Sequence, residues 1–356
     1  MLLKLIVKWS LKISEFEIID QKKLLQIFIG DNPMSIKLIN PRNKQPLKLI
    51  GDVFFDLSGN KFSLVSGVLR ISHQVNYADN FGMQWNKFDK TQLDRQEEGH
   101  TISHRRFFAE THWGAQDLTE KNVLEVGSGA GRFSRVVLES TSANLYSIDF
   151  SDAVTANFKN NSSIAANRFH LFQASIYEMP FPDNSFDKVF CLGVLQHTPS
   201  FDESVSALIS KAKPGGEIVV DFYPIKGWWT KINAKYMLRP FLKRLDHKRL
   251  MQMIEANVNW LMKAEVLLHR LGLGVLARFL PIVDIKGTIP KYLSAAEKRE
   301  WVVLDTFDMF SPEYDNPQRI RDVAAMFERN GADVTFAGFE HFDGFCAAVV
   351  RGIKRT

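Results

Sequence analysis

The chain has 356 residues, of which 45% are hydrophobic and 12% aromatic, and its formal net charge is +5. This composition excludes a disordered or low-complexity protein and supplies apolar residues for one large core or two smaller ones. The mild charge, without an arginine-rich tail or zinc-finger spacing, disfavours a nucleic-acid-binding protein. The two cysteines, Cys191 and Cys346, lie in apolar runs and predict reduced, buried thiols, as in a reducing compartment.

Neither the first residues nor the longest apolar run carries a targeting or membrane-spanning signal. The stretch MLLKLIVKWSLKI contains two lysines and lacks a small-residue cleavage site, which argues against a signal peptide. The run LMKAEVLLHRLGLGVLARFLPIV is interrupted by Lys263, Glu265, Arg270 and Arg278, so it should not span a bilayer. We therefore expect a soluble, cytoplasmic protein.

The pattern of strand-like and helical segments divides the chain into four regions. Residues 1–75 show short strand-like pieces between turn-forming residues and predict a small β-rich module, and 76–120 predict a helical lid or linker. Strands and helices alternate over 121–225 and again over 301–356, whereas 226–300 predict a helical cap insertion. Apolar strands separated by amphipathic helices predict an α/β fold with a parallel sheet covered on both faces and a ligand at the carboxyl ends of its strands.

The stretch VLEVGSGAGRFS combines a predicted strand, a glycine-rich turn and a predicted helix. Gly127, Gly129 and Gly131 give this turn a backbone without Cβ atoms, so a ligand can approach it closely. A dinucleotide fingerprint would place its third glycine where Arg132 stands, so the match to that pattern is imperfect.

Two acids accompany the glycine-rich turn. Glu125 stands two residues before the first glycine, and Asp149 ends the next apolar run, NLYSID. At this spacing the second carboxylate can accept hydrogen bonds from both ribose hydroxyls of a bound nucleoside. The spacing alone suits either a dinucleotide or an S-adenosyl cofactor.

These segments, followed by FHLFQASIYEMPFPDNSFDKVFCLGVLQHTPS and KAKPGGEIVVDFY, resemble the class I S-adenosylmethionine-dependent methyltransferases. The likeness covers roughly 120–225 and the final pair of strands, and it implies S-adenosyl-L-methionine as cofactor. It also implies a Rossmann-like fold with a mostly parallel seven-stranded sheet and helices on both faces. The residues that it assigns to the cofactor are Glu125, Gly127, Gly129, Gly131, Asp149, Phe150, Ala174, Ser175, Ile176 and Gly193. The family often has an Asp where Ser175 stands, so adenine recognition departs from the usual pattern.

A narrower resemblance lies in YADNFGMQWNKFDKTQLD and VVLDTFDMFSPEYDNPQ, which are similar to segments of bacterial methyltransferases that modify sugars, polysaccharides and natural products. It implies a sugar or a lipid-linked glycan as acceptor. Such relatives often begin with a zinc-ribbon-like module, whose outline the amino-terminal region keeps without any cysteine, so we expect no metal. Packing of alternating apolar side chains is expected to replace it: Phe54, Phe55, Phe62 and Leu64.

His197, in GVLQHT just beyond the predicted fourth strand, is the candidate catalytic base. Methyl transfer is an in-line displacement at a sulfonium carbon, so the protein mainly aligns the reactants and removes a proton when the acceptor is a hydroxyl. A histidine at the end of the sheet has suitable chemistry for this step. The alternative is a structural histidine that caps the loop or packs on the cofactor.

Two segments before the core offer further contacts to the cofactor. In FGMQWNKF, Gln84 is a candidate lid residue that hydrogen-bonds the cofactor, whereas Phe81 and Trp85 fit the core-facing side of an amphipathic helix. Arg105 or its neighbour Arg106 is placed to reach the methionine carboxylate as a charge-assisted partner. A solvated helix face is the alternative for one of these arginines.

The segment LDTFDMFSPEYD places acids beside aromatic rings. Asp305, Asp308 and Tyr314 are therefore candidate acceptor-binding residues, since carboxylates bind sugar hydroxyls and rings cover sugar C–H faces. The alternative is a loop whose acids cap helices. A metal site is not expected here, because no histidine accompanies the acids.

A basic stretch over 231–250 allows two interpretations. It is either a solvated helix face or a peripheral contact with an anionic membrane, which would suit a lipid-linked acceptor.

Taken together, these patterns predict a cytoplasmic methyltransferase that modifies an oxygen, or less often a nitrogen, of a small acceptor. One alternative is an RNA methyltransferase, which salt-sensitive nucleic-acid binding would reveal. Another is a non-catalytic protein that binds S-adenosylmethionine or membranes. A nicotinamide oxidoreductase is disfavoured by the missing third glycine.

Overall fold

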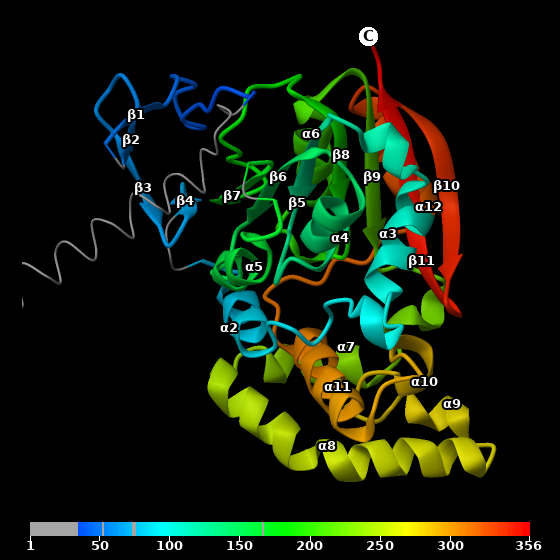
Figure 1. Ribbon diagram of the computed structural model, residues 1–356. Coiled ribbons are helices and arrows are strands. Elements are labelled where there is room, and N and C mark those ends of the chain that lie inside the picture. The colour runs from blue at the N-terminus through cyan, green and yellow to red at the C-terminus, as the bar shows by residue number, and fades with distance from the viewer. Residues whose placement is uncertain (1–34, 52, 73–75, 166) are drawn as a thin grey trace, which may run out of the picture.

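The computed structural model describes residues 35–51, 53–72, 76–165 and 167–356. The prediction that 1–13 is not a signal peptide, and the first part of the predicted β-rich module, therefore lie outside the described residues. Within the described residues, eleven strands form one sheet in the order β1-β2-β3-β4-β7-β6-β5-β8-β9-β11-β10. A layer of helices lies beyond one end of these strands (Figure 1).

Seven of the strands form the predicted Rossmann-like core. They are β5 (Asn122–Val126), β6 (Asn144–Asp149), β7 (Phe169–Gln173), β8 (Phe186–Cys191), β9 (Ala212–Phe222), β10 (Ala332–Phe342) and β11 (Phe345–Lys354). Strands β7, β6, β5, β8 and β9 run parallel, and β11 lies antiparallel between β9 and β10. The predicted α/β fold with a mostly parallel seven-stranded sheet is therefore confirmed.

Helices cover both faces of the core sheet because its strands are apolar on both sides. Successive side chains of a strand point to opposite faces, and in β5 Leu124 and Val123 enter two different buried clusters. The Leu124 cluster includes side chains of two helices, α6 (Phe201–Lys211) and α12 (Ile320–Arg329). The Val123 cluster includes side chains of three others, α3 (Ile102–Thr111), α4 (Arg132–Ser140) and α5 (Val154–Asn161).

The described part of the β-rich amino-terminal region continues the core sheet. Its four strands are β1 (Lys48–Ile50), β2 (Val53–Phe55), β3 (Lys61–Val65) and β4 (Val68–Arg70). They pair antiparallel with one another, and β4 then pairs parallel with β7 through Leu69 opposite Phe172. This region therefore covers the edge strand of the core instead of forming a separate sheet.

A polar cluster centred on Asp56 joins the turns of this region. Its Oδ2 accepts hydrogen bonds from the side-chain amides of Asn40 and Asn43 at 2.7 Å and of Asn60 at 2.6 Å. Burial acts to raise the pKa of Asp56, but the hydrogen bonds from these amides outweigh it and hold the pKa below its usual range. Phe54 is buried as predicted, yet the expectation that apolar packing alone holds this region is corrected by this cluster.

The predicted cap is helical and has its own apolar core. Its elements are η4 (Trp228–Lys231), α7 (Ala234–Leu242), α8 (His247–Arg270), α9 (Gly274–Ala277), α10 (Ile285–Thr288) and α11 (Ala295–Phe310). Asp246 caps α8 by accepting from the backbone N–H of Arg249, and Ser294 with Glu297 forms a capping box at the start of α11. The helical layer runs on to Phe310, ten residues beyond the predicted boundary at 300.

The stretch 231–250 is not the single basic helix that was expected. Helix α7 ends at Leu242 and α8 begins at His247, so the basic residues are divided between two helices and a turn. No helix in the described ranges combines the length and the apolar character that crossing a bilayer would require.

Candidate active site

A cavity of about 510 Å³ lies at the carboxyl ends of the core strands. Its floor is formed by the loops after β5, β6, β7, β8 and β9, which is where a parallel sheet offers a ligand site. Helix α2 (Asp79–Lys87), α10, α11 and the hairpin of β10 and β11 supply the other walls. The helical layer therefore covers the end of the sheet where the ligand was predicted to bind.

The glycine-rich turn after β5 forms one wall of the cavity and is held by β6. The backbone N–H groups of Gly127 and Ser128 donate to the carbonyl of Ile148 at 2.8 and 3.1 Å. The N–H of Gly129 donates to Oδ2 of Asp149 at 2.8 Å. Asp149 therefore lies in the cavity wall, as predicted, and also fixes the turn.

Gly127 must be glycine for two separate reasons. Its φ is +83°, and a Cβ atom there would lie only 2.3 Å from Cγ2 of Val194, in the loop that leads to His197. We expect Gly127→Ala to cost about 2–3 kcal/mol of stability and to weaken S-adenosylmethionine binding at least about tenfold. Urea unfolding and calorimetric titration measure the two effects.

Gly215→Ala is the matched control, because Gly215 has a φ of +77° and an added Cβ would meet no atom within 4 Å. It should show only the backbone cost of about 1 kcal/mol and normal cofactor binding. Equal losses of stability and of cofactor affinity in Gly127→Ala and Gly215→Ala would show that the structure accommodates the added contact with Val194 at no further cost.

Several other predicted cofactor residues line the cavity. Phe150 follows Asp149 at the end of β6, Ala174 and Ile176 follow β7, and Gly193 follows β8. The ring of Tyr77 lies with its centroid 5.0 Å from that of Phe150 and lines the same wall. An apolar and aromatic slot therefore lies beside the carboxylate of Asp149.

Three of the predicted cofactor residues lie behind this wall. Ser175 uses its hydroxyl to accept the backbone N–H of Tyr177 at 3.2 Å, and it does not line the cavity. Gly131 is the N-cap residue, directly before the first residue of α4, and has a φ of +87°. Glu125 is buried beneath the turn, where its Oε2 accepts hydrogen bonds from the hydroxyls of Ser134 and Ser147. The structure therefore corrects these three to residues that shape the site without lining it.

Burial gives Glu125 a pKa of about 7, which makes the stability of the protein depend on pH. When the pKa of a carboxyl is higher in the folded state than in the unfolded state, its contribution to the free energy of unfolding is fully present at pH values below the unfolded pKa. This contribution is lost as the pH rises through the folded pKa. We expect Glu125→Gln to remove about 2 kcal/mol of the decline in unfolding free energy between about pH 5.5 and about pH 8.

Urea denaturation at both pH values tests this expectation. Glu139→Gln, on the more exposed face of α4, is the control and should keep the native pH dependence. An unchanged pH dependence in Glu125→Gln would show that Glu125 is already ionised at neutral pH.

Of the two arginines that the sequence offered, Arg106 lines the cavity and Arg105 does not, and Arg132, the first residue of α4, lines it as well. Arg105 is more than half exposed and pairs with Asp343, outside the cavity. Arg106 lines the cavity, donates to Glu110 at 2.8 Å and pairs with Asp221 at the end of β9. Burial, together with the charge of Asp221, raises the pKa of Glu110 above its usual range. The candidate partner of the methionine carboxylate is therefore corrected to Arg106.

His197 lies in the cavity wall with one ring nitrogen anchored. It belongs to η3 (Leu195–His197), and its Nδ1 lies 3.1 Å from the carbonyl oxygen of Tyr314, to which only a protonated Nδ1 can donate. The proton on Nδ1 leaves a lone pair on Nε2, which has no hydrogen-bond partner among the described residues and lies 3.9 Å from Oδ2 of Asp308. Burial lowers the pKa of His197, so the ring is neutral at physiological pH.

The predicted acids lie on the α11 side of the cavity. Asp308 accepts a hydrogen bond from the hydroxyl of Tyr223 at 3.0 Å, and Asp305 accepts from Nε1 of Trp301 at 3.1 Å. Burial and the neighbouring Asp308 raise the pKa of Asp305 to about 8, so it carries a proton at neutral pH. Both acids line the cavity, whereas Tyr314 is placed behind His197 and holds it through its carbonyl.

Helix α2 forms the wall opposite the glycine-rich turn. Gln84 is fully buried and lines the cavity, and neither its Nε2 nor its Oε1 has a partner among the described residues. Phe81 and Trp85 line the same wall, and Trp85 also packs against the apolar core of the cap, as expected for a core-facing side chain. Buried polar groups are normally paired, so the unpaired amide of Gln84 keeps it a candidate for a ligand contact.

Sequence reasoning missed further residues of the cavity, among them Lys235 and Tyr223. Lys235, from α7, pairs with Asp315 at 2.9 Å, and its Nζ lies 4.5 Å from the ring centroid of Tyr223. Tyr223 follows β9, and its ring lies edge-on to His197 with a centroid distance of 5.6 Å. An aromatic residue directly after an apolar strand was the available signal for Tyr223.

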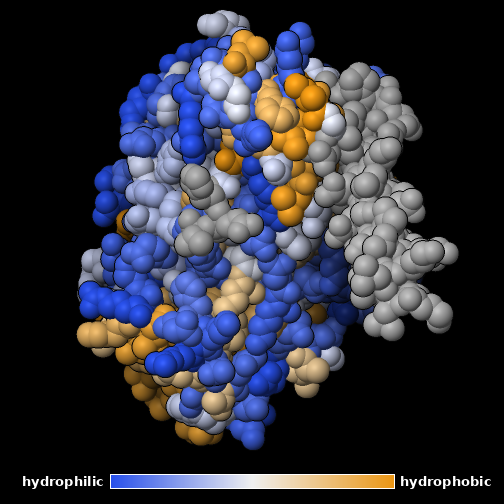
Figure 2. All heavy atoms as spheres, turned by 90° about the vertical axis from the view of Figure 1, so that its left-hand side faces the viewer, coloured by the Kyte–Doolittle hydropathy of each residue, from blue (hydrophilic) through white to orange (hydrophobic). Residues whose placement is uncertain are grey.

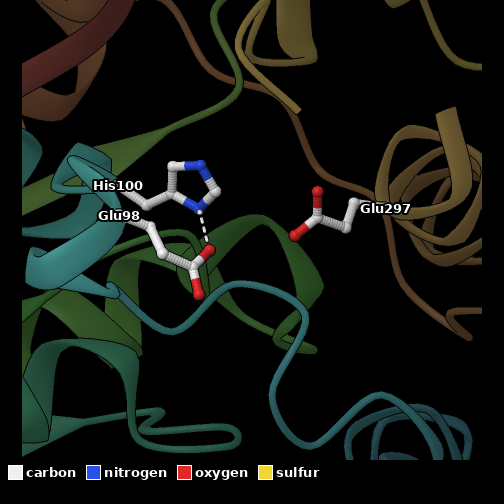
Figure 3. A group of neighbouring side chains, drawn as sticks. All are labelled: Glu98, His100 and Glu297. Atoms are coloured by element: carbon white, nitrogen blue, oxygen red, sulfur yellow. Dashed lines mark ion pairs between the residues drawn. The ribbon is translucent and has the colours of Figure 1, made fainter. Parts of the chain in front are cut away.

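A group of metal-ligand type lies away from these residues but is already occupied by an arginine. Glu98, His100 and Glu297 come together as Figure 3 shows. Nη2 of Arg95 lies 2.7 Å from Nδ1 of His100 and pairs with Glu297, and Nε of Arg95 lies 3.3 Å from Glu98. The guanidinium supplies the positive charge that a metal would bring, so this group is an ion cluster.

The known proteins to which this chain is similar include methyltransferases. Residues 124–220 match a protein-family model described as "Methyltransferase domain". The tRNA U34 carboxymethyltransferase of Nautilia profundicola is 27% identical over 200 residues, which are 55% of this chain and 60% of that protein. The enzyme of the same name from Idiomarina loihiensis is 33% identical over 31% of this chain and 35% of that protein. The chain thus spans between about a third and three fifths of the length of these curated relatives.

Among solved structures, the chain is similar to magnesium protoporphyrin IX methyltransferase of Synechocystis PCC 6803 with bound S-adenosylhomocysteine. That match has a TM-score of 0.44 and 15% identity, and it covers 79% of this chain and 97% of that one. It is also similar to 1,6-didemethyltoxoflavin-N1-methyltransferase of Burkholderia thailandensis, with a TM-score of 0.44 and 12% identity over 83% of this chain and 96% of that one.

The strand order and the glycine-rich turn are those of a class I methyltransferase fold. Within this fold, residues 124–220 are the part that matches the methyltransferase-domain model.

Proposed function

We propose that the protein transfers a methyl group from S-adenosylmethionine to a hydroxyl oxygen of a small polar acceptor, a sugar or glycoconjugate, in the cytoplasm. The observation that carries this proposal is the neutral His197, whose Nδ1 is held by Tyr314 and whose Nε2 is unpaired in the cavity wall. The buried thiol of Cys191 supports a reducing compartment, whereas Cys346 is exposed, so the prediction that both thiols are buried was wrong for Cys346.

The cavity fits the cofactor in three places. The slot at Phe150, Ala174 and Ile176 suits adenine, and Asp149 suits the ribose hydroxyls. The unpaired amide of Gln84 and the guanidinium of Arg106 offer donors on the opposite side, where an amino-acid carboxylate requires them. S-adenosylmethionine supplies, when bound, a methyl group activated on a sulfonium sulfur.

The residues of the chain then have three tasks. The glycine-rich turn and α2 enclose the reacting groups and exclude water. Nε2 of His197 accepts the proton of the acceptor hydroxyl as its oxygen forms the new bond to carbon and the carbon–sulfur bond breaks. Asp308, 3.9 Å from Nε2, stabilises the imidazolium that results.

The polar groups around His197 favour a hydroxyl-rich acceptor. Asp308 is an acceptor for a hydroxyl, and the protonated Asp305 is a donor. The aromatic rings of Tyr223 and Trp301 line the same part of the cavity and suit the C–H face of a sugar ring. This combination supports a sugar more than an apolar acceptor.

The test is a methyl-transfer assay with isotopically labelled S-adenosylmethionine and separate pools of nucleotide sugars, lipid-linked glycans and tRNA. We expect labelled sugar products, and none with His197→Asn, which keeps a donor for the carbonyl of Tyr314 but has no base at Nε2. Binding of the cofactor without transfer to any pool would instead support a non-catalytic role.

A second candidate is modification of tRNA, which the names of the curated relatives favour. Label in tRNA, with binding that weakens steeply as salt is raised, would select this candidate over the sugar acceptor.

A further inference from the structure

The outer face of the cap exposes a concentration of large apolar side chains. Of the 22 large hydrophobic residues that are exposed in the described parts of the chain, 15 lie between Trp228 and Phe279. The most exposed are Trp228 at 81%, Val275 at 77% and Phe241 at 69%. Figure 2 shows apolar areas along the lower edge of the molecule, where Figure 1 places α8 and α9. An apolar surface of this kind marks an interaction site.

Hydrogen bonds and packing join these segments into one face. The backbone N–H of Ala234 donates to the carbonyl of Arg278 at 3.0 Å, and Nη2 of Arg278 donates to the carbonyl of Trp229 at 2.7 Å. Element η4 and the start of α7 therefore lie beside α9, which packs against α8. The exposed side chains of 228–279 are called the outer cap face below.

Helix α8 has two apolar sides, and only one of them is used inside the protein. Leu250, Ile254, Val258 and Leu261, spaced by three and four residues, are buried against α11 and its neighbours. A second set, at seven-residue spacing, is exposed: Met253, Trp260 and Leu267. The first set explains why the helix packs, whereas the second has no role in the fold.

The same region is strongly basic. Residues 226–290 contain 12 lysines and arginines against 4 acidic residues, so their formal charge is +8, more than the +5 of the whole chain. Lys235 and Lys243 pair with Asp315 and Glu313. Eight other basic side chains of this region are exposed and form no ion pair in the described parts of the chain: Lys226, Lys231, Arg244, Lys248, Arg249, Lys263, Arg270 and Lys286.

We propose that the outer cap face binds the surface of an anionic lipid bilayer. Large apolar side chains with interspersed lysine and arginine are what an interfacial surface requires, because the apolar groups enter the acyl boundary and the cations meet the headgroups. Nucleic acid would use the cations but not the exposed aliphatic groups. A second copy of the chain would bring two faces of the same positive charge together. The same insertion contributes Lys235, Val283 and Thr288 to the cavity, so binding places the active site beside the bilayer.

Vesicle flotation with the full chain tests the proposal. We expect binding to vesicles of equal parts phosphatidylcholine and phosphatidylglycerol, much weaker binding to phosphatidylcholine alone, and weakening by salt. Lys263→Gln with Arg270→Gln should reduce binding on the order of 30-fold, since each cation near an anionic surface contributes about fivefold. The triple variant Trp228→Ser, Phe241→Ser and Val275→Ser should reduce it by more than about 100-fold.

Ile50→Ser with Leu57→Ser is the matched control, because these side chains are 66% and 68% exposed but lie in the amino-terminal strands and turns. It should bind vesicles normally. Equal binding to neutral and anionic vesicles, or undiminished binding by the triple variant, would overturn the proposal.

Two other results would also overturn the proposal. One is sedimentation of the native chain as a dimer that dissociates only in the triple variant. The other is binding of the native chain to tRNA that is lost only in the double variant, Lys263→Gln with Arg270→Gln. Titration of the native chain and of each variant with S-adenosylmethionine separates this proposal from the proposed function. If the native chain binds vesicles but not S-adenosylmethionine, the proposed function fails and the membrane proposal stands.

Discussion

His197→Asn is expected to lower kcat by about 10²- to 10⁴-fold and to change the affinity for S-adenosylmethionine by less than about threefold. The reason is that Asn retains a donor toward the carbonyl of Tyr314 but places no basic nitrogen where Nε2 lies. Single-turnover methyl transfer and calorimetric titration measure the two quantities separately.

The pH profile of kcat supplies the second readout for His197. Burial lowers the pKa of His197, so the native enzyme should keep full activity down to below about pH 6.5 and lose it only as the ring becomes protonated. The Asn variant should lack this acidic limb. Near-normal turnover of His197→Asn across the pH range would make His197 a structural residue.

Asp149→Ala is expected to weaken S-adenosylmethionine binding by about 100-fold or more. Its carboxylate is the group placed for the ribose hydroxyls, and it also accepts the N–H of Gly129 and the N–H and hydroxyl of Ser151. Its removal therefore deletes ligand contacts and leaves donors of the glycine-rich turn unpaired, at a cost of about 1–3 kcal/mol for each buried group.

Asp152→Ala is the matched control for Asp149. Asp152 lies three residues further along, is more than half exposed, pairs with Arg70 and does not line the cavity. Calorimetric titration should give native affinity for this variant. Comparable losses in the two variants would point to a general disturbance of the loop after β6 and not to ribose recognition.

The core of the fold was predictable because its signals are local. Each apolar run that ends at a glycine, acid or turn became a strand, and the carboxyl ends of parallel strands fall together in any such sheet. The parallel pairing of β4 with β7 was not predictable, since Leu69 and Phe172 are far apart in sequence and nothing in three-residue strands specifies their partner.

The candidate site was predicted most accurately at the carboxyl ends of strands and in the segments that follow them. Asp149 ends β6, and Gly193 and His197 lie in the segment after β8, so all three line the cavity. Adjacent residues of a helix point in different directions, so the pair Arg105 and Arg106 left two choices open. The spacing of four residues between Arg106 and Glu110 was the signal for the inward member.

Acids inside apolar runs were harder to place. The position of Glu125 before the glycines predicts a contact with the ligand. Because side chains alternate along β5, its carboxylate instead lies under the turn and contacts Ser134 and Ser147. Asp221, near the end of the apolar run of β9, is not among the predicted site residues. A buried acid at the end of a strand needs a partner close by, and this requirement was the signal for it.

Strand β11 lies between β9 and β10, although it is synthesised after both of them. Until Lys354 has been synthesised, β9 has no neighbour on that side, and its free edge is open to pairing with other chains. The nascent protein therefore reaches its native sheet only after translation of this strand, and premature termination before Phe345 would yield a chain prone to aggregation.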